Sequence, residues 1–373
     1  MINYHHFFYY KLYNINTIFE LNIIIYHKYY YIMYKMDKKK PDKNKSVKNK
    51  SVKKKLDKKK SDKKKSDKKK SDKKKSDKKK SVKKKLDKNK SDKNKSDEKT
   101  VNNSRFAYVM LMFGGDKYLP GALTLAYSIR IRSSYDIVCM VTHDVSTSAI
   151  NKMIKHGIIV YKVNYMKYKV KRMKSKRQQD LYSKWMHLSF TKWQCLSLVQ
   201  YEKVLFLDAD MLALDCVDEL FELKTPAGVF NNPYIKNNLY NKHKKRIPKE
   251  VIKKSITSNS FAPTAACVLL SPSKTHLANL KKMIKSMEPF GLNSISGFDE
   301  QSISYYYSVY NKGPKTDWRR IEKEYSYVWK YGKPTKKIKI MDFFGEKKPW
   351  ELNPSKYPDL KLWHSVWEKI KHI

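Results

Sequence analysis

The chain has 373 residues, enough for one large or two small domains, and its 82 Lys plus Arg against 35 Asp plus Glu give a net charge of +47. Its four cysteines are widely spaced in apolar stretches, which excludes a disulfide framework and a cysteine-based zinc site and favours buried thiols in a reducing compartment. The composition changes sharply near Ser104. Residues 1–103 hold 36 Lys against 12 Asp plus Glu, yet both parts of the chain are basic.

Residues 1–35 form an atypical N-terminal extension rich in Tyr, Ile, Asn and Phe. Charged residues such as Lys11 and Glu20 interrupt its apolar runs before any reaches the roughly 20 residues that a membrane span needs, so a transmembrane helix is not expected. Two interpretations stay open. The segment is a weak signal anchor around residues 15–34, or it is an untranslated upstream extension, because Met36 opens the next segment directly.

The lysine-rich tail, residues 36–103, repeats Ser-Asp-Lys-Lys-Lys with a period of five and has almost no aromatic residues. Dense like charge with low hydrophobicity prevents the burial of a core, so we predict a disordered tail. Its function stays open between two interpretations. The tail attaches electrostatically to nucleic acid, an anionic membrane surface or an acidic partner, or it is a solvated tether.

Residues 104–373 are predicted to form one folded domain. A continuous apolar run over residues 106–113 predicts a buried strand, and Gly114, Gly115 and Asp116 predict the tight loop that ends it. The predicted elements that follow are a helix from Pro120, a strand over 136–142, a helix over 146–156 and a strand over 158–163. Strands that alternate with helices predict a parallel sheet covered on both faces.

A ligand of such a sheet is expected at the carboxyl ends of the strands, where the loop with Gly115 lies. This loop has neither the GxGxxG nor the GxxxxGK[ST] pattern, so nucleotide recognition must depend on other residues. Two glycines in a strand-to-helix turn more often reflect ordinary turn chemistry than a site that holds a ligand.

The sharpest motif is Asp208-Ala209-Asp210, which follows the apolar strand predicted over residues 201–207. Two carboxylates at the end of a buried strand need compensation. Their hard oxygen ligands suit manganese or magnesium that bridges a diphosphate. We therefore predict a metal site at Asp208 and Asp210. The alternative is a plain turn at the end of the strand.

Further motifs occur in a fixed order along residues 105–350: Tyr118-Leu-Pro-Gly121, Thr191-Lys192, Phe206-Leu-Asp208-Ala-Asp210, Glu300-Gln301 and Phe343-Phe-Gly345-Glu-Lys-Lys348-Pro-Trp350. Together they resemble the glycogenin-like members of glycosyltransferase family 8, including the virus-encoded type. The resemblance implies a single GT-A-type domain, that is, a Rossmann-like α/β domain with a mostly parallel central sheet. It also implies a retaining transferase that moves a hexose, first of all glucose from UDP-glucose, to a hydroxyl acceptor.

The resemblance implies a role for each matching residue. Tyr118 stacks on uracil, Lys192 approaches the sugar or diphosphate, and Lys348 neutralises the leaving diphosphate. The complete set of implied nucleotide-sugar-binding residues is Tyr118, Gly115, Lys192, Asp208, Gly345 and Lys348.

Catalysis and metal binding are implied in the same way. Gln301 lies near the anomeric carbon, Glu300 orients the sugar or the acceptor, and Asp299 shares that role. The acids near Phe298 also suit a helix N-terminus, and the two interpretations are compatible. The metal ligands are Asp208, Asp210 and Asp342, for manganese with magnesium as the alternative. Asp342 stands where the family has His, and His364 is an open alternative to it.

Two further departures from the family pattern leave the acceptor undetermined. Thr264-Ala265-Ala266 replaces the family pattern near the acceptor, and residues 231–260 form a Lys-rich insertion that is an acceptor lid or a mobile loop.

The expected partners are a UDP-sugar donor, a glycan or protein hydroxyl acceptor and, through the tail, nucleic acid or an anionic surface; a homodimer stays open. High Lys, Asn, Ile and Tyr content suggests an AT-rich coding sequence. The Asp342-Phe-Phe-Gly345 ending resembles that of glycogenin-like transferases of large DNA viruses, which implies a virus-encoded enzyme in host cytoplasm. The rival hypotheses are a catalytically inactive transferase fold that binds nucleic acid or membrane through the tail, and a nucleotidyltransferase.

Overall fold

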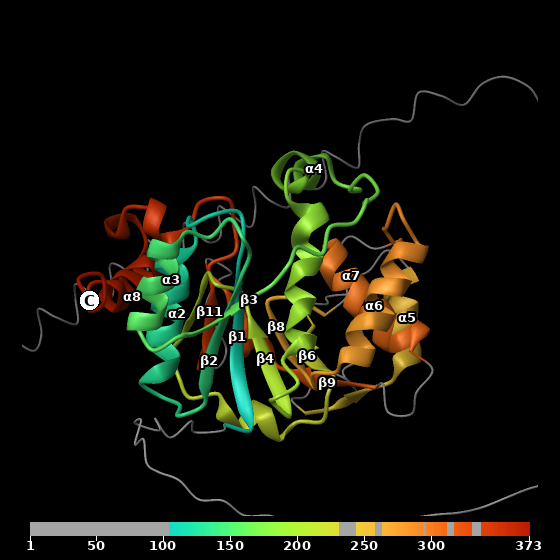
Figure 1. Ribbon diagram of the computed structural model, residues 1–373, viewed down its shortest axis with the longest axis horizontal. Helices are drawn as coiled ribbons and strands as arrows, with labels where there is room; N and C mark the ends of the chain where they lie inside the picture. Colours follow the sequence, from blue (N-terminus) through green and yellow to red (C-terminus); the bar gives the residue numbers. More distant parts are fainter. Residues whose placement is uncertain (1–103, 231–243, 258–262, 294–295, 312–316, 330–336) are drawn as a thin grey trace, which may run out of the picture. The chain divides into compact units, whose positions relative to one another are not determined.

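The computed structural model describes residues 104–230, 244–257, 263–293, 296–311, 317–329 and 337–373 (Figure 1). By its internal contacts the chain divides into residues 1–100 and 101–373, and every described residue belongs to the second unit. The predictions for the N-terminal extension and the lysine-rich tail lie outside the described residues. None of the helices in the described part is long and apolar enough to cross a membrane.

An eight-stranded sheet forms the centre of the unit, with its strands side by side in the order β3 (Ile159–Lys162), β2 (Asp136–Val141), β1 (Phe106–Met112), β4 (Lys203–Leu207), β8 (Cys267–Leu270), β6 (Ala227–Val229), β9 (Trp318–Ile321) and β7 (Arg246–Ile247). Strands β8 and β7 run antiparallel to their neighbours, and the others run parallel to one another. The prediction of a mostly parallel α/β sheet is therefore confirmed.

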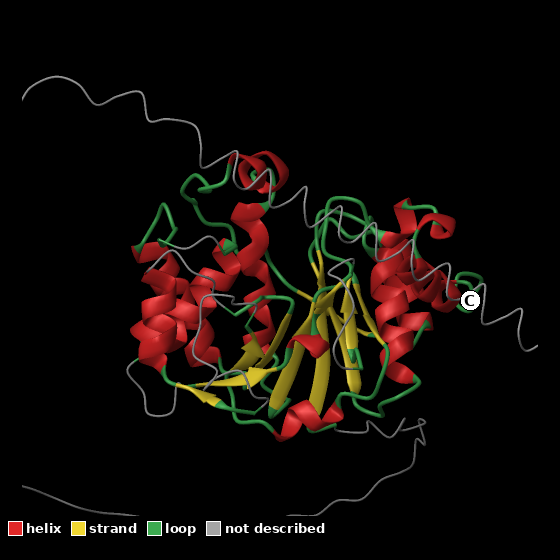
Figure 2. Ribbon diagram, turned by 180° about the vertical axis from the view of Figure 1, so that it is seen from behind, coloured by secondary structure: helices red, strands yellow, loops and turns green. Residues whose placement is uncertain are grey.

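Helices cover both faces of this sheet, as Figures 1 and 2 show. One face carries α2 (Leu119–Arg130), α3 (Thr147–Lys155) and α8 (Pro358–Trp367). The other face carries the 3₁₀ segment η1 (Met186–Ser197) and α5 (Lys249–Thr257), α6 (Lys274–Ser286) and α7 (Phe298–Tyr305), with α4 (Lys176–Tyr182) above them. Shorter segments are η2 (Asp218–Glu222), η5 (Lys323–Tyr325), η6 (Pro349–Glu351), η7 (Pro354–Lys356) and the π-helical η4 (Tyr306–Tyr310).

The apolar run of β1 explains why it lies between two helical layers. Successive side chains of a strand point to opposite faces. Tyr108 and Met110 belong to the hydrophobic core on the α2 side, whereas Val109 and Leu111 belong to the core on the η1 side. A strand buried on both faces has no polar face, as the sequence predicted.

The loop after β1 and the start of α2 follow from their residues. Gly114 and Gly115 both have positive φ, 73° and 85°, which glycine adopts without strain. Pro120 lies in the first turn of α2. At Gly121 an added Cβ would lie 2.4 Å from the carbonyl oxygen of Ala209, so only glycine lets α2 approach the segment between the two aspartates this closely.

A second, three-stranded sheet brings the C-terminal motif to the aspartate motif. It consists of β10 (Tyr327–Val328), β11 (Ile340–Asp342) and β5 (Met211–Ala213). Strand β11 runs antiparallel to β5, with Asp342 opposite Met211. The backbone N–H of Phe343 donates to the carbonyl of Asp210 at 3.1 Å. This pairing places Asp342 beside Asp210.

The described part of the insertion over residues 231–260 forms β7 and α5, and α5 packs against α7 and η4. The remaining insertion residues lie outside the described part. The four cysteines are free thiols, and three of them are buried, in agreement with the expectation from their spacing.

Candidate active site

The aspartate motif lies at the carboxyl end of β4, beside β8. The backbone N–H of Asp208 donates to the carbonyl of Ala266 at 3.1 Å, just before β8 begins. Asp210 is 8% exposed, whereas Asp208 is partly exposed. The sheet therefore presents two carboxylates at the edge where a ligand was expected.

The first cluster, called here the Lys192 cluster, consists of Lys192, Asp208 and Asp299. The Lys192 ammonium from η1 lies 2.9 Å from an oxygen of Asp208 and 3.0 Å from an oxygen of Asp299 at the start of α7. Burial opposes the charged form of Lys192, but the two carboxylates outweigh it and raise its pKa. Burial raises the pKa of Asp208 to about 6, against the opposing effect of Lys192 and with a further rise from Asp210. One cation is thus shared by two acids.

The second cluster, the Lys348 cluster, consists of Lys348, Asp210 and Asp342. The Lys348 ammonium lies 2.5 Å from an oxygen of Asp210. Asp342 accepts a hydrogen bond from the Ser326 hydroxyl at 3.2 Å. Burial, and then the nearby charges of Asp210 and Asp208, raise the pKa of Asp342 to about 8. This cluster therefore holds one carboxyl group whose charge is not compensated by a direct ion pair in the described residues.

The carboxylates of the two clusters are candidate ligands for a divalent metal ion. No group of three or more His, Cys, Asp or Glu side chains in the described part has the arrangement that holds a metal ion, and both lysines contact the aspartates directly. The donor chemistry nevertheless fits: Asp208, Asp210 and Asp342 offer hard oxygen ligands. Burial first, and then the charges of neighbouring carboxylates, raise the pKa values of Asp208 and Asp342, and a bound cation would relieve the repulsion between these groups.

Tyr118 lies beside the Lys348 cluster. The Lys348 ammonium is 5.6 Å from the centre of the Tyr118 ring, and the Trp350 ring meets Tyr118 edge-on at 5.5 Å. Burial raises the pKa of Tyr118 to about 12, although Lys348 opposes this. Tyr118 is therefore a neutral aromatic ring next to a cation, an arrangement that suits a base attached to a diphosphate. Stacking on uracil stays a prediction.

The start of α7 carries the predicted catalytic residues. Glu300 accepts hydrogen bonds from the backbone N–H of Gly297 at 2.9 Å and of Ala265 at 3.1 Å, so it forms the predicted helix cap. Burial and the neighbouring Asp299 raise the pKa of Glu300 to about 7. Of the acidic pair at this helix start, Asp299 contacts Lys192, whereas Glu300 contacts backbone.

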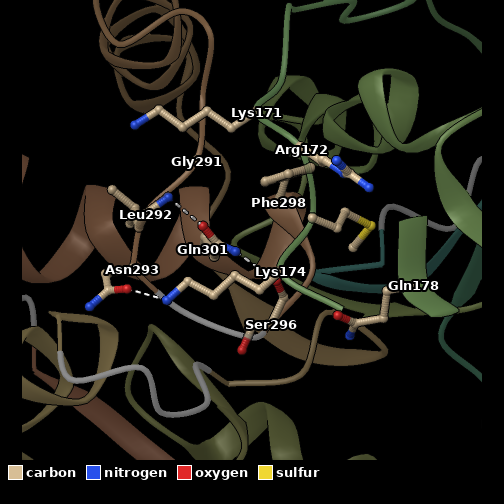
Figure 3. A pocket seen from close by; sticks show the side chains of 11 residues that line it. Lys171, Arg172, Lys174, Gln178, Gly291, Leu292, Asn293, Ser296, Phe298 and Gln301 are labelled. Carbon is tan, nitrogen blue, oxygen red and sulfur yellow. Dashed lines mark hydrogen bonds between the residues drawn. The ribbon is translucent and has the colours of Figure 1, made fainter. Parts of the chain in front are cut away.

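Gln301 is 2% exposed and lines a cavity beside the α7 start (Figure 3). Its side-chain oxygen accepts from the backbone N–H of Leu292 at 2.7 Å, and its side-chain nitrogen donates to the carbonyl of Ser296 at 2.6 Å. These bonds fix the orientation of the amide. Gln301 is thus held within one helical turn of Asp299.

The remaining predicted residues differ in position. Gly345 has a φ of 143° and borders a second cavity, between α4 and the loop that precedes Lys348. Gly115 lies in the loop after β1, where an added Cβ would meet no atom, so its φ explains it. His364 bonds through Nε2 to the carbonyl of Pro349 at 3.1 Å and packs against Trp363. These contacts favour packing over metal binding for His364.

Some contributing groups were not predicted. The backbone of Ala265 and Ala266, in the segment that departs from the family pattern, binds Glu300 and Asp208. Ser326 binds Asp342. No local pattern marks these residues, because their roles arise from the pairing of β8 with β4 and of β10 with β11. Knowledge of the strand order would have been the only signal.

Comparison with known proteins adds sequence relatives. The model of the family described as Glycosyl transferase family 8 matches residues 109–263. Uncharacterized protein R707 of Acanthamoeba polyphaga mimivirus is 29% identical over 297 residues, which cover 72% of this chain and 96% of that protein. The crystal structure of the galactosyltransferase LgtC with donor and acceptor sugar analogs covers 70% of this chain and 95% of that chain, with a TM-score of 0.45 and 12% identity.

Plant enzymes match shorter segments. UDP-glucuronate:xylan alpha-glucuronosyltransferase 1 of Arabidopsis thaliana is 29% identical over 37% of this chain and 20% of its own length. Galactinol synthase 1 of Solanum lycopersicum is 29% identical over 33% of this chain and 38% of its own length. The chain thus spans well under half of each plant enzyme. The family model spans the aspartate motif, and the viral relative matches over nearly its whole length, so this chain is similar to members of glycosyltransferase family 8.

Proposed function

We propose that this nucleotide-sugar-dependent glycosyltransferase moves a hexose, with glucose from UDP-glucose as the first candidate, to a hydroxyl acceptor with retention of configuration. The observation that carries the proposal is the meeting of two lysines and four carboxylates at the carboxyl end of β4. A nucleoside diphosphate needs cations at its phosphates, and buried lysines held by carboxylates supply them at fixed positions.

The donor is proposed to lie along the two clusters. Tyr118 would contact the base, because its ring borders the Lys348 ammonium that would bind the diphosphate. Lys192 would bind the sugar or the diphosphate from the opposite side. Lys348 then stabilises the negative charge that develops on the leaving diphosphate, and its burial strengthens that interaction.

A divalent metal, manganese first and magnesium second, is part of the proposal. Asp208, Asp210 and Asp342 would hold it, and Lys192 and Lys348 would turn from the aspartates toward the donor. When bound, the metal would neutralise charge on the diphosphate. Three carboxylates make a harder and more negative site than two carboxylates and a histidine, which favours oxygen-preferring ions.

The sugar end is proposed to lie near α7. Asp299 and Glu300 would orient the sugar or the acceptor, and Gln301 would lie near the anomeric carbon. Burial of Asp299 and Gln301 excludes bulk water from the α7 side of the sugar, which limits competing hydrolysis. The donor sugar itself is best tested as a panel, because the similar plant enzymes are named for glucuronate transfer and for galactinol synthesis.

We further propose a reducing, cytoplasmic compartment, supported by the four free cysteines. In a viral setting this would be the host cytoplasm, and the mimivirus relative supports that setting.

The test is nucleotide release by the full-length chain from UDP-glucose, UDP-galactose, UDP-xylose, UDP-glucuronate and GDP-mannose, with manganese, magnesium or chelator. We expect release from one donor, dependent on metal and reduced at least about 10²-fold in Asp210→Asn. The control is Asp215→Asn, a carboxylate that pairs with Lys337 and Lys339 outside the site. Absence of release from every donor would reject catalysis and favour an inactive fold that acts through its basic tail.

A further inference from the structure

The cavity that Gln301 lines has a volume of about 250 Å³ and is bordered by residues 171–174 on one wall and 291–293 on the other. Figure 3 shows Lys174 extending across it toward Asn293. This cavity lies beside the α7 start that also carries Asp299, and none of the six implied nucleotide-sugar-binding residues lines it.

Backbone hydrogen bonds hold the wall of residues 171–174 in place. The N–H of Phe290 donates to the carbonyl of Lys169 at 2.8 Å, and the N–H of Lys171 donates to the carbonyl of Phe290 at 2.8 Å. Farther along, the N–H of Met173 donates to the side-chain oxygen of Gln179 in α4 at 2.8 Å. The wall is therefore fixed at both ends, which distinguishes it from a freely moving run of surface lysines.

Close packing keeps the two walls together. A Cβ added at Gly291 would lie 3.0 Å from the Cβ of Lys171 and 3.2 Å from the Phe298 ring. Glycine thus permits the basic wall to approach the α7 start. The walls enclose a cavity whose position relative to Gln301 is defined by backbone.

The charge of the cavity is one-sided. Lys171, Arg172 and Lys174 line it, and no Asp or Glu is among the described residues that line it. Lys174 donates a hydrogen bond to the amide oxygen of Asn293 on the opposite wall. Three cations around a cavity without acids favour an anionic ligand.

The second cavity, of about 400 Å³ beside Gly345, shows that this imbalance is not general. Lys176 and Arg177 line it, but so do Asp180 and Glu346. Its two cations and two acids balance. Of these two cavities beside the same basic stretch of sequence, the one that Gln301 lines is the one whose described lining has a net positive charge.

We infer that the cavity formed by residues 171–174, residues 291–293 and Gln301 binds an anionic group, a phosphate or a carboxylate, carried by the acceptor sugar. The inference rests on the proposed function. In the proposed function Lys348 and Lys192 bind the donor diphosphate, and neither of them lines this cavity, so the diphosphate does not need its cations. An acceptor held here by its anion would present its hydroxyl groups toward the α7 start.

Binding can be tested without turnover through Met173, which lines the cavity. Full-length protein with ¹³C-methyl methionine is titrated with methyl glucoside, methyl glucoside 6-phosphate and methyl glucuronoside, and the Met173 signal is assigned with Met173→Leu. We expect the two anionic probes to shift this signal and to bind at least about tenfold more tightly than methyl glucoside. Lys171→Glu with Lys174→Glu should remove that preference, whereas Lys282→Glu on α6 should keep it. Equal binding of neutral and anionic probes would overturn the inference.

Transfer separates this inference from the proposed function. With the active donor, the anionic sugars should have the lower acceptor KM, and the double charge reversal should raise it about tenfold while acceptor-independent nucleotide release is unchanged. Nucleotide release without any acceptor preference for anions would reject the cavity and leave the proposed function intact. A Met173 shift with UDP-glucuronate but not with UDP-glucose would assign the anion to the donor and overturn the acceptor role. Anion binding in a protein without turnover would reject both the acceptor role and the proposed function.

Discussion

The Lys192 cluster and the Lys348 cluster have the same composition, one lysine and two aspartates, but different compensation. Lys192 contacts both of its carboxylates. Lys348 contacts Asp210, whereas Asp342 has a hydroxyl partner and a pKa raised to about 8. Charge balance is therefore more complete at the α7 side of the site than at the β11 side. An added cation should therefore stabilise the β11 side of the site more than the α7 side.

Removal of Lys192 should give the largest loss of stability. Lys192→Ala leaves Asp208 and Asp299 without their shared cation, and breaking a buried ion pair costs roughly 3–5 kcal/mol. We expect a loss of that order in the free energy of unfolding, measured with urea at pH 7. Lys339→Ala is the matched control, because Lys339 also pairs with two acids but at a more exposed place, where the cost is about 0–1 kcal/mol. Equal losses in both variants would contradict this account.

Removal of Lys348 should affect turnover more than stability. Asp342 can take up a proton near neutral pH, which removes its repulsion with Asp210. Without metal, removal of the lysine should therefore lower the free energy of unfolding less in the Lys348 cluster than in the Lys192 cluster. We expect Lys348→Ala to lower kcat about 10²–10³-fold, the usual effect of losing a group that stabilises a developing anion. Lys348→Arg should restore part of the rate. A stability loss as large as that of Lys192→Ala would remove the contrast between the clusters.

Gly121 belongs to neither cluster, but it allows α2 to approach the segment between Asp208 and Asp210. An added Cβ would lie 2.4 Å from the carbonyl oxygen of Ala209, the residue between the two aspartates in the sequence, and 2.7 Å from the Trp350 ring. Gly121→Ala should therefore cost about 1–3 kcal/mol through overpacking, measured by urea unfolding, and should lower activity. Ala126→Gly in the same helix separates local crowding from helix propensity. Unchanged stability in Gly121→Ala would show that α2 shifts without cost.

Asp342→Asn tests the uncompensated carboxyl group. The folded pKa, about 8, exceeds the ordinary 3.8, so the stability associated with the protonated group is complete below about pH 4 and is lost as the pH rises through 8. With chelator at pH 8 we expect the variant to be more stable than the natural protein by at least about 1 kcal/mol, roughly one pKa unit. With manganese the natural protein should gain more stability than the variant. Thermal unfolding at pH 5 and pH 8 measures both effects, and destabilisation of the variant at pH 8 with chelator would contradict the account.

The sequence predicted local features of the fold well. The apolar run of β1, the glycines after it and the helix predicted over residues 146–156 each depend on residues close in the chain, and the structure confirms all three. The aspartate motif was found for the same reason, since Asp208 and Asp210 directly follow an apolar strand.

The partners of these aspartates could not be predicted from local pattern. Asp342 reaches Asp210 only through the pairing of β11 with β5, and Lys192 reaches Asp299 only because η1 packs against α7. The resemblance indicated which residues belong together but not how their charges balance. The cavity at Gln301 was missed altogether, because it depends on the approach of residues 169–171 to Phe290.

The most direct test of the central claim is calorimetric binding of UDP to the full-length chain, with and without manganese, in the natural protein and in Asp210→Asn. If a metal bound by the aspartates of the two clusters is needed for nucleotide binding, UDP should bind tightly only when manganese is present. In Asp210→Asn this dependence on manganese should be lost. Binding of UDP that is equally strong with chelator, or unchanged in Asp210→Asn, would contradict the account.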